Sequence, residues 1–266
     1  MGKSVEGIVW DEAKRFLNKD PSKRKLILGL YALSLKGLET GKLARASYFY
    51  VRHLDDLLDG EMPGIANPSE YARDRRKQVE TKEFTGGSAI DSLAKYILPR
   101  LERKAKPTDD PQNEFLTVID AMMHDGDRRL DRRVSSTDDL LAHYKKSMDP
   151  GLNIFLMATE SDLRTNAIPD YGTSLERLYN VRDLAKDWNL GLINVPEEVL
   201  DTAELTPDVT YHELKNSAVI DEWRHGEIKD ASAYLWQIQE SVLPDTEALT
   251  RRVLGGLAQQ AAKSVA

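Results

Sequence analysis

Apolar residues recur along the chain at intervals of three and four, the spacing that places them on one face of an α-helix. In residues 89–104, for example, one helical stripe contains Ile90, Leu93, Ile97 and Leu101. Runs of β-branched residues that alternate with polar ones, which would indicate strands, are missing. The pattern therefore predicts an all-α protein, and we expect a single domain over residues 1–266.

Pro, Gly and Asp-rich turns separate the predicted helices. We expect helices over residues 10–17, 22–36, 44–60, 68–82, 89–104, 112–133, 136–148, 152–160, 174–189, 210–242 and 245–263. Pro99 is expected to kink or split its helix. Residues 149–151, Asp-Pro-Gly, should interrupt another helix, and Gly226 should break the long one that begins at residue 210.

The helix over residues 44–60 carries three aspartates in the pattern D-D-x-x-D. At about 100° per residue, one face of this helix gathers four polar side chains within about 60° of one another: Tyr48, Arg52, Asp55 and Asp59. The remaining aspartate, Asp56, lies somewhat to the side. An otherwise apolar helix thus presents a polar, acidic face.

Carboxylates on an apolar helix carry a large desolvation cost, so this face is either wet or holds a cation. Acids four residues apart can share a hard ion such as Mg²⁺, which keeps some water and bridges carboxylates to phosphates. Arg52, one turn upstream, is suited to a phosphate oxygen. A solvated acidic helix end is the alternative, because Gly and Pro in residues 60–64 stop the helix there.

A second acidic helix follows at residues 174–189. Asp183 and Asp187 are four residues apart with Arg182 beside them, and two further polar side chains lie within about 60° of that pair: Glu176 and Asn180. Two acidic helices far apart in sequence can oppose one another across a bundle cavity, provided that divalent cations stand between them. A surface helix of mixed charge is the alternative for this segment taken alone.

Composition excludes several classes of protein. The chain is 41% hydrophobic and 30% charged, which suits an ordered helical globule, and its net charge of −7 gives no general footprint for nucleic acid. The absence of Cys excludes disulfides, thiolate zinc sites and Cys nucleophiles. We expect neither a signal peptide nor a transmembrane helix, since no window approaches roughly 18 uninterrupted apolar residues.

Taken together, the two acidic stretches resemble the squalene/phytoene synthase family of isoprenoid synthases. The resemblance rests on Tyr48-x-x-x-Arg52-x-x-Asp55-Asp56-x-x-Asp59 and on Arg182-Asp183-x-x-x-Asp187, followed by Gly191 and Val195-Pro196-x-x-x-Leu200. Met122-Met123-His124-Asp125, and the segment from Ser136 through Tyr144 to Gly151, agree more loosely. The match covers about residues 22–260 in the same order, which is more specific than either acidic motif alone.

The resemblance implies an isoprenoid-synthase helical bundle around a central apolar cavity. Members of the family use Mg²⁺, with Mn²⁺ as an alternative, to hold prenyl diphosphates between the two acidic helices. Carried over onto this chain, the metal ligands would be Asp55, Asp56, Asp59, Asp183 and Asp187, with Glu176 and Asn180 as further candidates. Diphosphate contacts would come from Arg52 and Arg182, and Tyr48 and Tyr144 would line the reacting pocket.

The second motif departs from the family pattern at several positions. Tyr179 stands where members carry Asn, with Asn180 next to it, and Glu176 replaces the usual Gln. Lys186 replaces the acid before the second Asp, and residues 190–192, Leu-Gly-Leu, replace Arg-Gly-Arg. The loss of two arginines and one ligand weakens the case for a site with two diphosphates, whereas Glu176 or Asn180 could restore metal coordination.

Three functions therefore stay open. The first is a prenyltransferase that condenses two prenyl diphosphates, farnesyl or geranylgeranyl, head to head. The second is a terpene synthase of the same fold that ionises a single diphosphate. The third is a non-catalytic relative that acts through protein contacts, although the first motif is intact.

The expected location is the cytoplasm, with contact at the membrane periphery for a lipophilic product. Four arginines form a basic patch that could meet a membrane surface: Arg128, Arg129, Arg132 and Arg133. An ordinary solvated helix is the simpler explanation of this patch.

Overall fold

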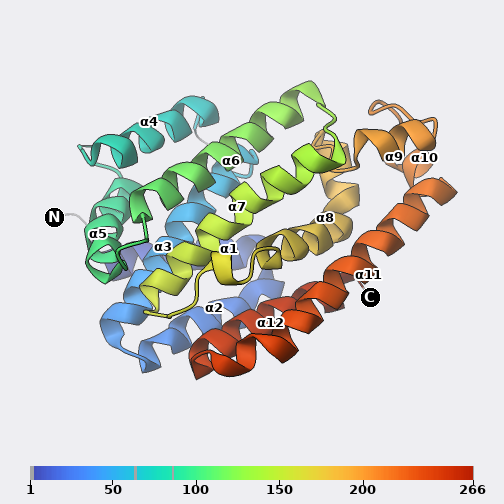
Figure 1. Cartoon of the computed structure of the whole chain (residues 1–266). Helices are drawn as coiled ribbons and strands as arrows, with labels where there is room; N and C mark the ends of the chain where they lie inside the picture. The colour runs from blue at the N-terminus through green and yellow to red at the C-terminus, as the bar shows by residue number, and fades with distance from the viewer. Residues whose placement is uncertain (1–2, 63–64, 86, 266) are drawn as a thin grey trace. The chain divides into compact units, whose positions relative to one another are not determined.

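The computed structural model describes residues 3–62, 65–85 and 87–265, and every regular element within those ranges is a helix (Figure 1). The helices form two compact units, the first of residues 1–123 and 150–161 and the second of residues 124–149 and 162–266. Helices α6 (Pro111–Asp131) and α7 (Thr137–Ala158) contribute residues to both units. The all-α prediction is confirmed, whereas the single domain stays a prediction.

The first unit is organised around helix α3, which spans Leu38–Leu58. Its other helices are α1 (Val5–Lys19), α2 (Arg24–Ala32), α4 (Pro68–Thr81) and α5 (Ala89–Lys104), and 3₁₀ turns lie at Pro21–Lys23 and Leu33–Leu35. Helix α3 (Leu38–Leu58) packs against α1, α2, α4 and α5. Phe49, Leu54 and Leu57 on α3 are fully buried. The helix that carries the first acidic motif is therefore the interior helix of this unit.

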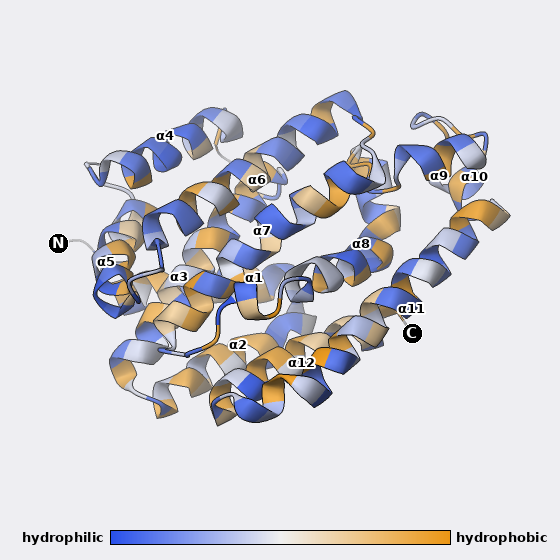
Figure 2. Cartoon of the chain, in the orientation of Figure 1, coloured by the Kyte–Doolittle hydropathy of each residue, from blue (hydrophilic) through white to orange (hydrophobic). Residues whose placement is uncertain are grey.

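Local sequence explains where the helices of the first unit begin and which face they bury. Ser88 and Asp91 form the capping box that starts α5, each side chain accepting the backbone N–H of the other residue. Helix α4 buries only Ala72 and Val79, and Figure 2 shows it as largely hydrophilic. Among the helices that the structure describes, none combines the length and apolar character that crossing a membrane requires.

The second unit is organised around α8 (Tyr171–Leu190). Its other helices are α9 (Glu197–Thr202), α10 (Tyr211–Lys215), α11 (Ala218–Ser241) and α12 (Ala248–Val265), with 3₁₀ turns at Thr165–Ala167 and Leu243–Asp245. Helix α8 packs against α11 and α12. An apolar cluster ties its end to the loop and helices that follow: Leu184, Trp188, Ile193, Val195, Leu200, Leu214 and Ile220. This cluster holds the loop at residues 191–195 against the last two turns of α8.

Two of the predicted helix interruptions are wrong. Helix α7 runs without a break through Pro150, and α11 runs through Gly226. The chain instead leaves the helix between α10 and α11, at residues 216–217. A Pro inside a helix costs about 3 kcal/mol and a Gly about 1 kcal/mol. Burial of the residues that flank Pro150, such as Leu152 and Ile154, outweighs a local cost of that size.

Gly191 ends α8 in a left-handed conformation, with φ of +88°, and a Cβ there would lie 2.7 Å from the carbonyl oxygen of Arg129. Gly191→Ala is therefore expected to lower the free energy of unfolding by about 1–3 kcal/mol. Gly226→Ala is the control, since nothing lies within 4 Å of its Cβ position. It should stabilise the protein by about 0.5–1 kcal/mol. Chemical denaturation measures the free energy of unfolding of both variants. Equal changes in the two would contradict a special requirement for glycine at position 191.

Asp149 is 8% exposed, and its Oδ1 atom would lie 2.5 Å from a Cβ on Gly172, so glycine makes room for it. Burial raises the pKa of Asp149 to about 6. The folded state then holds this proton more tightly than the unfolded chain, so stability falls as the pH rises from about 4 to about 6. Asp149→Asn should remove this decrease, as unfolding titrations across the same window would show. If stability depended on pH in the same way in the variant, Asp149 would not be the cause of the decrease.

Candidate active site

The first acidic motif lies at the C-terminal end of α3. Asp55 and Asp56 are in its last turn, and Asp59 follows its last residue with helical backbone angles. A helix C-terminus carries partial negative charge, so acids are unfavourable there unless cations compensate them. The structure supplies those cations from α3 itself and from α1.

Asp56 is the buried centre of this compensation, with a side chain that is 0% exposed. Arg15 Nη1 lies 2.6 Å from its Oδ2 atom. Its other oxygen, Oδ1, is 2.9 Å from Lys19 Nζ and 2.5 Å from Arg52 Nη2. Burial opposes ionisation, but the charge of Arg52 and the hydrogen bonds from Lys19 and Arg15 hold the pKa of Asp56 below its usual value. Both oxygens are thus engaged by cations.

Arg52 links this buried acid to the more exposed part of the motif. Its guanidinium pairs with Asp55 as well as with Asp56. Burial disfavours its charge, but the two carboxylates outweigh burial and raise the pKa of Arg52 above its ordinary value. Asp55 and Asp59 are both only partly buried. The predicted polar face of α3 is therefore present, with Asp56 turned into the protein.

Tyr48 lies one turn before Arg52 in a small aromatic cluster. Its ring meets those of Phe16 and Phe49 edge-on, with centroids 6.3 and 5.2 Å away. The guanidinium of Arg52 lies 5.2 Å from the centroid of Phe16. Edge-to-face packing of this kind restrains an aromatic ring. Tyr48 therefore contacts α1 and α3, and its predicted place in a reacting pocket stays a prediction.

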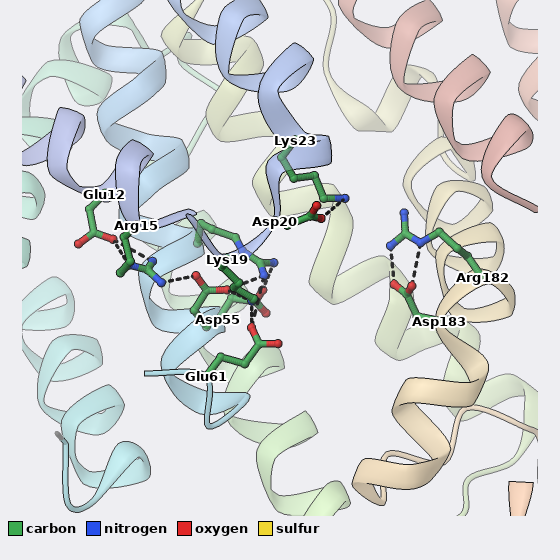
Figure 3. Close-up of polar contacts among 11 residues, drawn as sticks. Glu12, Arg15, Lys19, Asp20, Lys23, Asp55, Glu61, Arg182 and Asp183 are labelled. Carbon is green, nitrogen blue, oxygen red and sulfur yellow. Dashed lines mark hydrogen bonds and ion pairs between the residues drawn. The ribbon is translucent and has the colours of Figure 1, made fainter. Parts of the chain in front are cut away.

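Sequence reasoning missed Arg15, Lys19 and Glu61, which lie around the first acidic motif. Figure 3 shows Arg15 and Lys19 of α1 beside Asp55 and Glu61 at the end of α3, and Lys19 also pairs with Glu61. Arg15 and Lys19 are four residues apart, so they share a face of their helix. That spacing was the only feature of the sequence that could have linked Arg15 and Lys19 to each other. Their shared partner, Asp56, lies about 40 residues further along the chain.

The second acidic motif lies on α8. Arg182 forms a double hydrogen bond with Asp183, with Nε donating to Oδ1 at 2.8 Å and Nη2 donating to Oδ2 (Figure 3). That hydrogen bonding raises the pKa of Arg182 above its ordinary value. The same guanidinium lies 4.6 Å from the ring centroid of Tyr179, the residue that stands in place of the usual Asn. Arg182 is thus paired with Asp183 on α8, as Arg52 is paired with Asp55 on α3.

Asn194 connects several of the other predicted residues of the second unit. Its amide nitrogen lies 3.1 Å from Asn180 Oδ1 and 3.4 Å from Asp187 Oδ2. The hydroxyl of Tyr144 lies 3.5 Å from its carbonyl oxygen. Burial, followed by the charge of Glu176, raises the pKa of Tyr144, so its phenol stays neutral. The structure thus brings Tyr144, Asn180 and Asp187 around one loop residue that sequence reasoning missed.

Arg128 is buried, contrary to the prediction of a solvated basic patch. Its side chain is 1% exposed, and it donates to Asp125, to the carbonyl oxygen of Ile193 and to Asn194. Arg132 donates to the carbonyl oxygens of Pro207 and Trp188. Arg128 and Arg132 are therefore used inside the second unit, so the solvated-helix explanation is wrong for Arg128.

The donor chemistry of the two motifs fits Mg²⁺. Each of two helices supplies a partly exposed pair of aspartates four residues apart: Asp55 with Asp59, and Asp183 with Asp187. Mg²⁺ keeps several waters and needs only one or two carboxylates besides phosphate oxygens. Within the described residues, no three His, Asp or Glu side chains form a ready-made metal site. The ligand assignments, including Asp56, Glu176 and Asn180, stay predictions, as does the cavity between α3 and α8.

No protein-family model matches the chain, and no curated protein matches it. Among solved structures, a dehydrosqualene synthase in complex with a ligand gives a TM-score of 0.67 at 14% sequence identity, over 96% of this chain and 86% of that one. The squalene synthase HpnC from Alicyclobacillus acidocaldarius gives a TM-score of 0.70 at 16% identity, over 98% and 92%. The chain has the fold of these synthases. The expected isoprenoid-synthase fold is thereby confirmed.

Asp56→Asn is expected to destabilise the protein by about 2–4 kcal/mol, because it leaves three cations around a neutral amide. Asp120→Asn is the control, since Asp120 pairs with Arg76 at a side chain that is 48% exposed. Its loss should be about 0–1 kcal/mol. Urea unfolding of both variants provides the comparison, and similar small losses would show that Asp56 is not a structural centre.

Proposed function

We propose that the protein is a Mg²⁺-dependent prenyltransferase that joins two prenyl diphosphates head to head. The support is a fold shared with squalene and dehydrosqualene synthases over 96–98% of the chain, combined with an arginine-flanked aspartate pair on α3 and another on α8. The substrates would be farnesyl or geranylgeranyl diphosphate. A lipophilic product would fit a cytoplasmic enzyme that works at the membrane periphery.

In this proposal the metal ions would be held by Asp55, Asp59, Asp183 and Asp187. Mg²⁺ bound there would neutralise the diphosphate and make it a better leaving group. Arg52 and Arg182 each lie beside one of these carboxylates, and a guanidinium there suits phosphate oxygens. Asp56 is left out of the ligand set, because its two oxygens already bind Arg15, Lys19 and Arg52.

The reaction begins when the carbon–oxygen bond of an allylic diphosphate breaks and its electron pair leaves with the diphosphate. The double bond of the second prenyl chain then supplies the pair for a new carbon–carbon bond, and loss of a proton closes a cyclopropane. Tyr144 is buried and stays protonated. A neutral phenol offers an aromatic face to the cation and carries no phenolate charge that could trap it.

A terpene synthase that ionises one diphosphate is the second candidate. The segment at residues 190–192 holds Leu-Gly-Leu and so offers no guanidinium for a second diphosphate. Arg132, whose side chain lies 3.4 Å from the Cβ position of Gly191, is occupied by the carbonyl oxygens of Pro207 and Trp188. Arg132 therefore does not replace the missing pair.

Incubation with labelled farnesyl or geranylgeranyl diphosphate and Mg²⁺ separates the candidates. A product with twice the carbon skeleton supports the head-to-head prenyltransferase. A terpene with the skeleton of one substrate supports the second candidate and rejects the first. A chain that turns over neither substrate, with either Mg²⁺ or Mn²⁺, would reject both and favour a relative that acts through protein contacts.

Asp55→Asn and Asp183→Asn should each lower turnover by about 10²–10⁴-fold, because each removes a charge that holds the metal ion. Asp74→Asn is the control, since Asp74 is an exposed carboxylate on α4 outside both motifs, and its turnover should match the parent. Product formation under saturating Mg²⁺ measures the effect. Activity retained in both motif variants would rule out these aspartates as ligands.

A further inference from the structure

Arg128 is a buried cation that pairs with Asp125 on its own helix and also reaches the loop at residues 193–194. It sits on α6 within the second unit, and its side chain is 1% exposed. Nη1 donates to Asp125 at 2.9 Å, while Nη2 donates to the carbonyl oxygen of Ile193 at 2.5 Å and to Asn194 Oδ1 at 3.2 Å. Asp125 is shared with His143, whose Nε2 lies 2.8 Å from the same carboxylate oxygen.

Stability alone is a weak reason for a charge in this place. A buried ion pair loses so much hydration that a well-packed apolar pair of similar size is often as stable or more so. What an arginine adds over an apolar side chain is direction, since its planar guanidinium only donates and donates at fixed angles. Arg128 can therefore fix the orientation of the groups that accept its hydrogen bonds.

Asn194, which is 4% exposed, is oriented by this guanidinium. Because Arg128 has no acceptor, Asn194 must turn its oxygen towards it. The amide nitrogen of Asn194 then faces two oxygens, Asn180 Oδ1 at 3.1 Å and Asp187 Oδ2 at 3.4 Å. The opposite orientation would place donor against donor and oxygen against carboxylate, so Arg128 sets the direction of the hydrogen bonds that reach α8.

The orientation of Asn194 decides what Asn180 can offer a ligand. Asn180 is 7% exposed, its oxygen accepts from Asn194, and its amide nitrogen has no hydrogen-bond partner among the described residues. A metal ion binds an amide through oxygen, whereas a phosphate oxygen binds it through nitrogen. In this arrangement the amide nitrogen of Asn180 can donate to an anion. The same Asn194 amide nitrogen holds Asp187 through its Oδ2 atom.

We propose that Arg128 is a positioning residue for the second acidic motif. Acting through Asn194, it holds Asp187 in place for the metal ion and turns the amide nitrogen of Asn180 towards a phosphate oxygen. This inference rests on the proposed function, because it takes magnesium diphosphate as the group that α8 binds. Neither Arg128 nor Asn194 touches the reacting atoms in this role.

The test is the binding of Mg²⁺ with inorganic diphosphate to the full chain, measured by titration calorimetry. Arg128→Met and Asn194→Ala should each weaken this binding by about 10- to 100-fold. Because both break the same relay, the double variant should bind no worse than the weaker single variant. Arg128→Lys covers the case in which Arg128→Met does not fold, and it should give a smaller loss because the charge is kept.

Arg45→Met is the matched control. Arg45 is also buried, at 4% exposed, but it donates to Ser34 and Glu6 in the first unit. It should lower stability while leaving the dissociation constant within about twofold of the parent. Binding by Arg128→Met that equals that of Arg45→Met, or losses that multiply in the double variant, would overturn the inference. A parent chain that binds no magnesium diphosphate would overturn the proposed function and this inference with it.

Discussion

The first unit depends on one buried carboxylate. Asp56 could not remain ionised inside the protein without the three cations around it, since an unpaired buried charge costs several kcal/mol. Satisfying it forces α1 to lie against the end of α3, because Arg15 and Lys19 both come from α1. The same interaction fixes Arg52, which in turn reaches Asp55. The place of a whole helix and the direction of a motif arginine thus follow from one acid.

The second unit uses the opposite charge for a comparable purpose. Arg128 is the buried ion there, compensated by Asp125 and by two oxygens from the loop at residues 193–194. That loop is held against α8 by the apolar cluster around Trp188. Asp56 lies next to Asp55 and is linked to it through Arg52, whereas Arg128 is linked to Asp187 through Asn194. Each buried charge therefore restrains the helix end or loop that the exposed acids need as a rigid support.

The fold followed from local patterns, whereas the supports of the site did not. The spacing of Ile90 to Leu101 predicted α5 to the residue, because the pattern acts within one helix. Pro150 misled the prediction, since a local cost was outweighed by burial elsewhere in α7. Arg15 and Arg128 could not be assigned, because their partners lie 41 and 66 residues away in sequence and only the fold brings them together.

Under the proposed function, the arginine of each motif would connect metal binding to diphosphate binding. Arg52 is paired with Asp55, and Arg182 with Asp183. A metal ion bound to the aspartate would release the arginine beside it, and a diphosphate bound to the arginine would release the aspartate. Each ligand therefore favours the other, which by linkage is a reciprocal coupling. Under the proposed function, this coupling would make a lone diphosphate bind weakly to the acidic residues until the cation that activates it is bound.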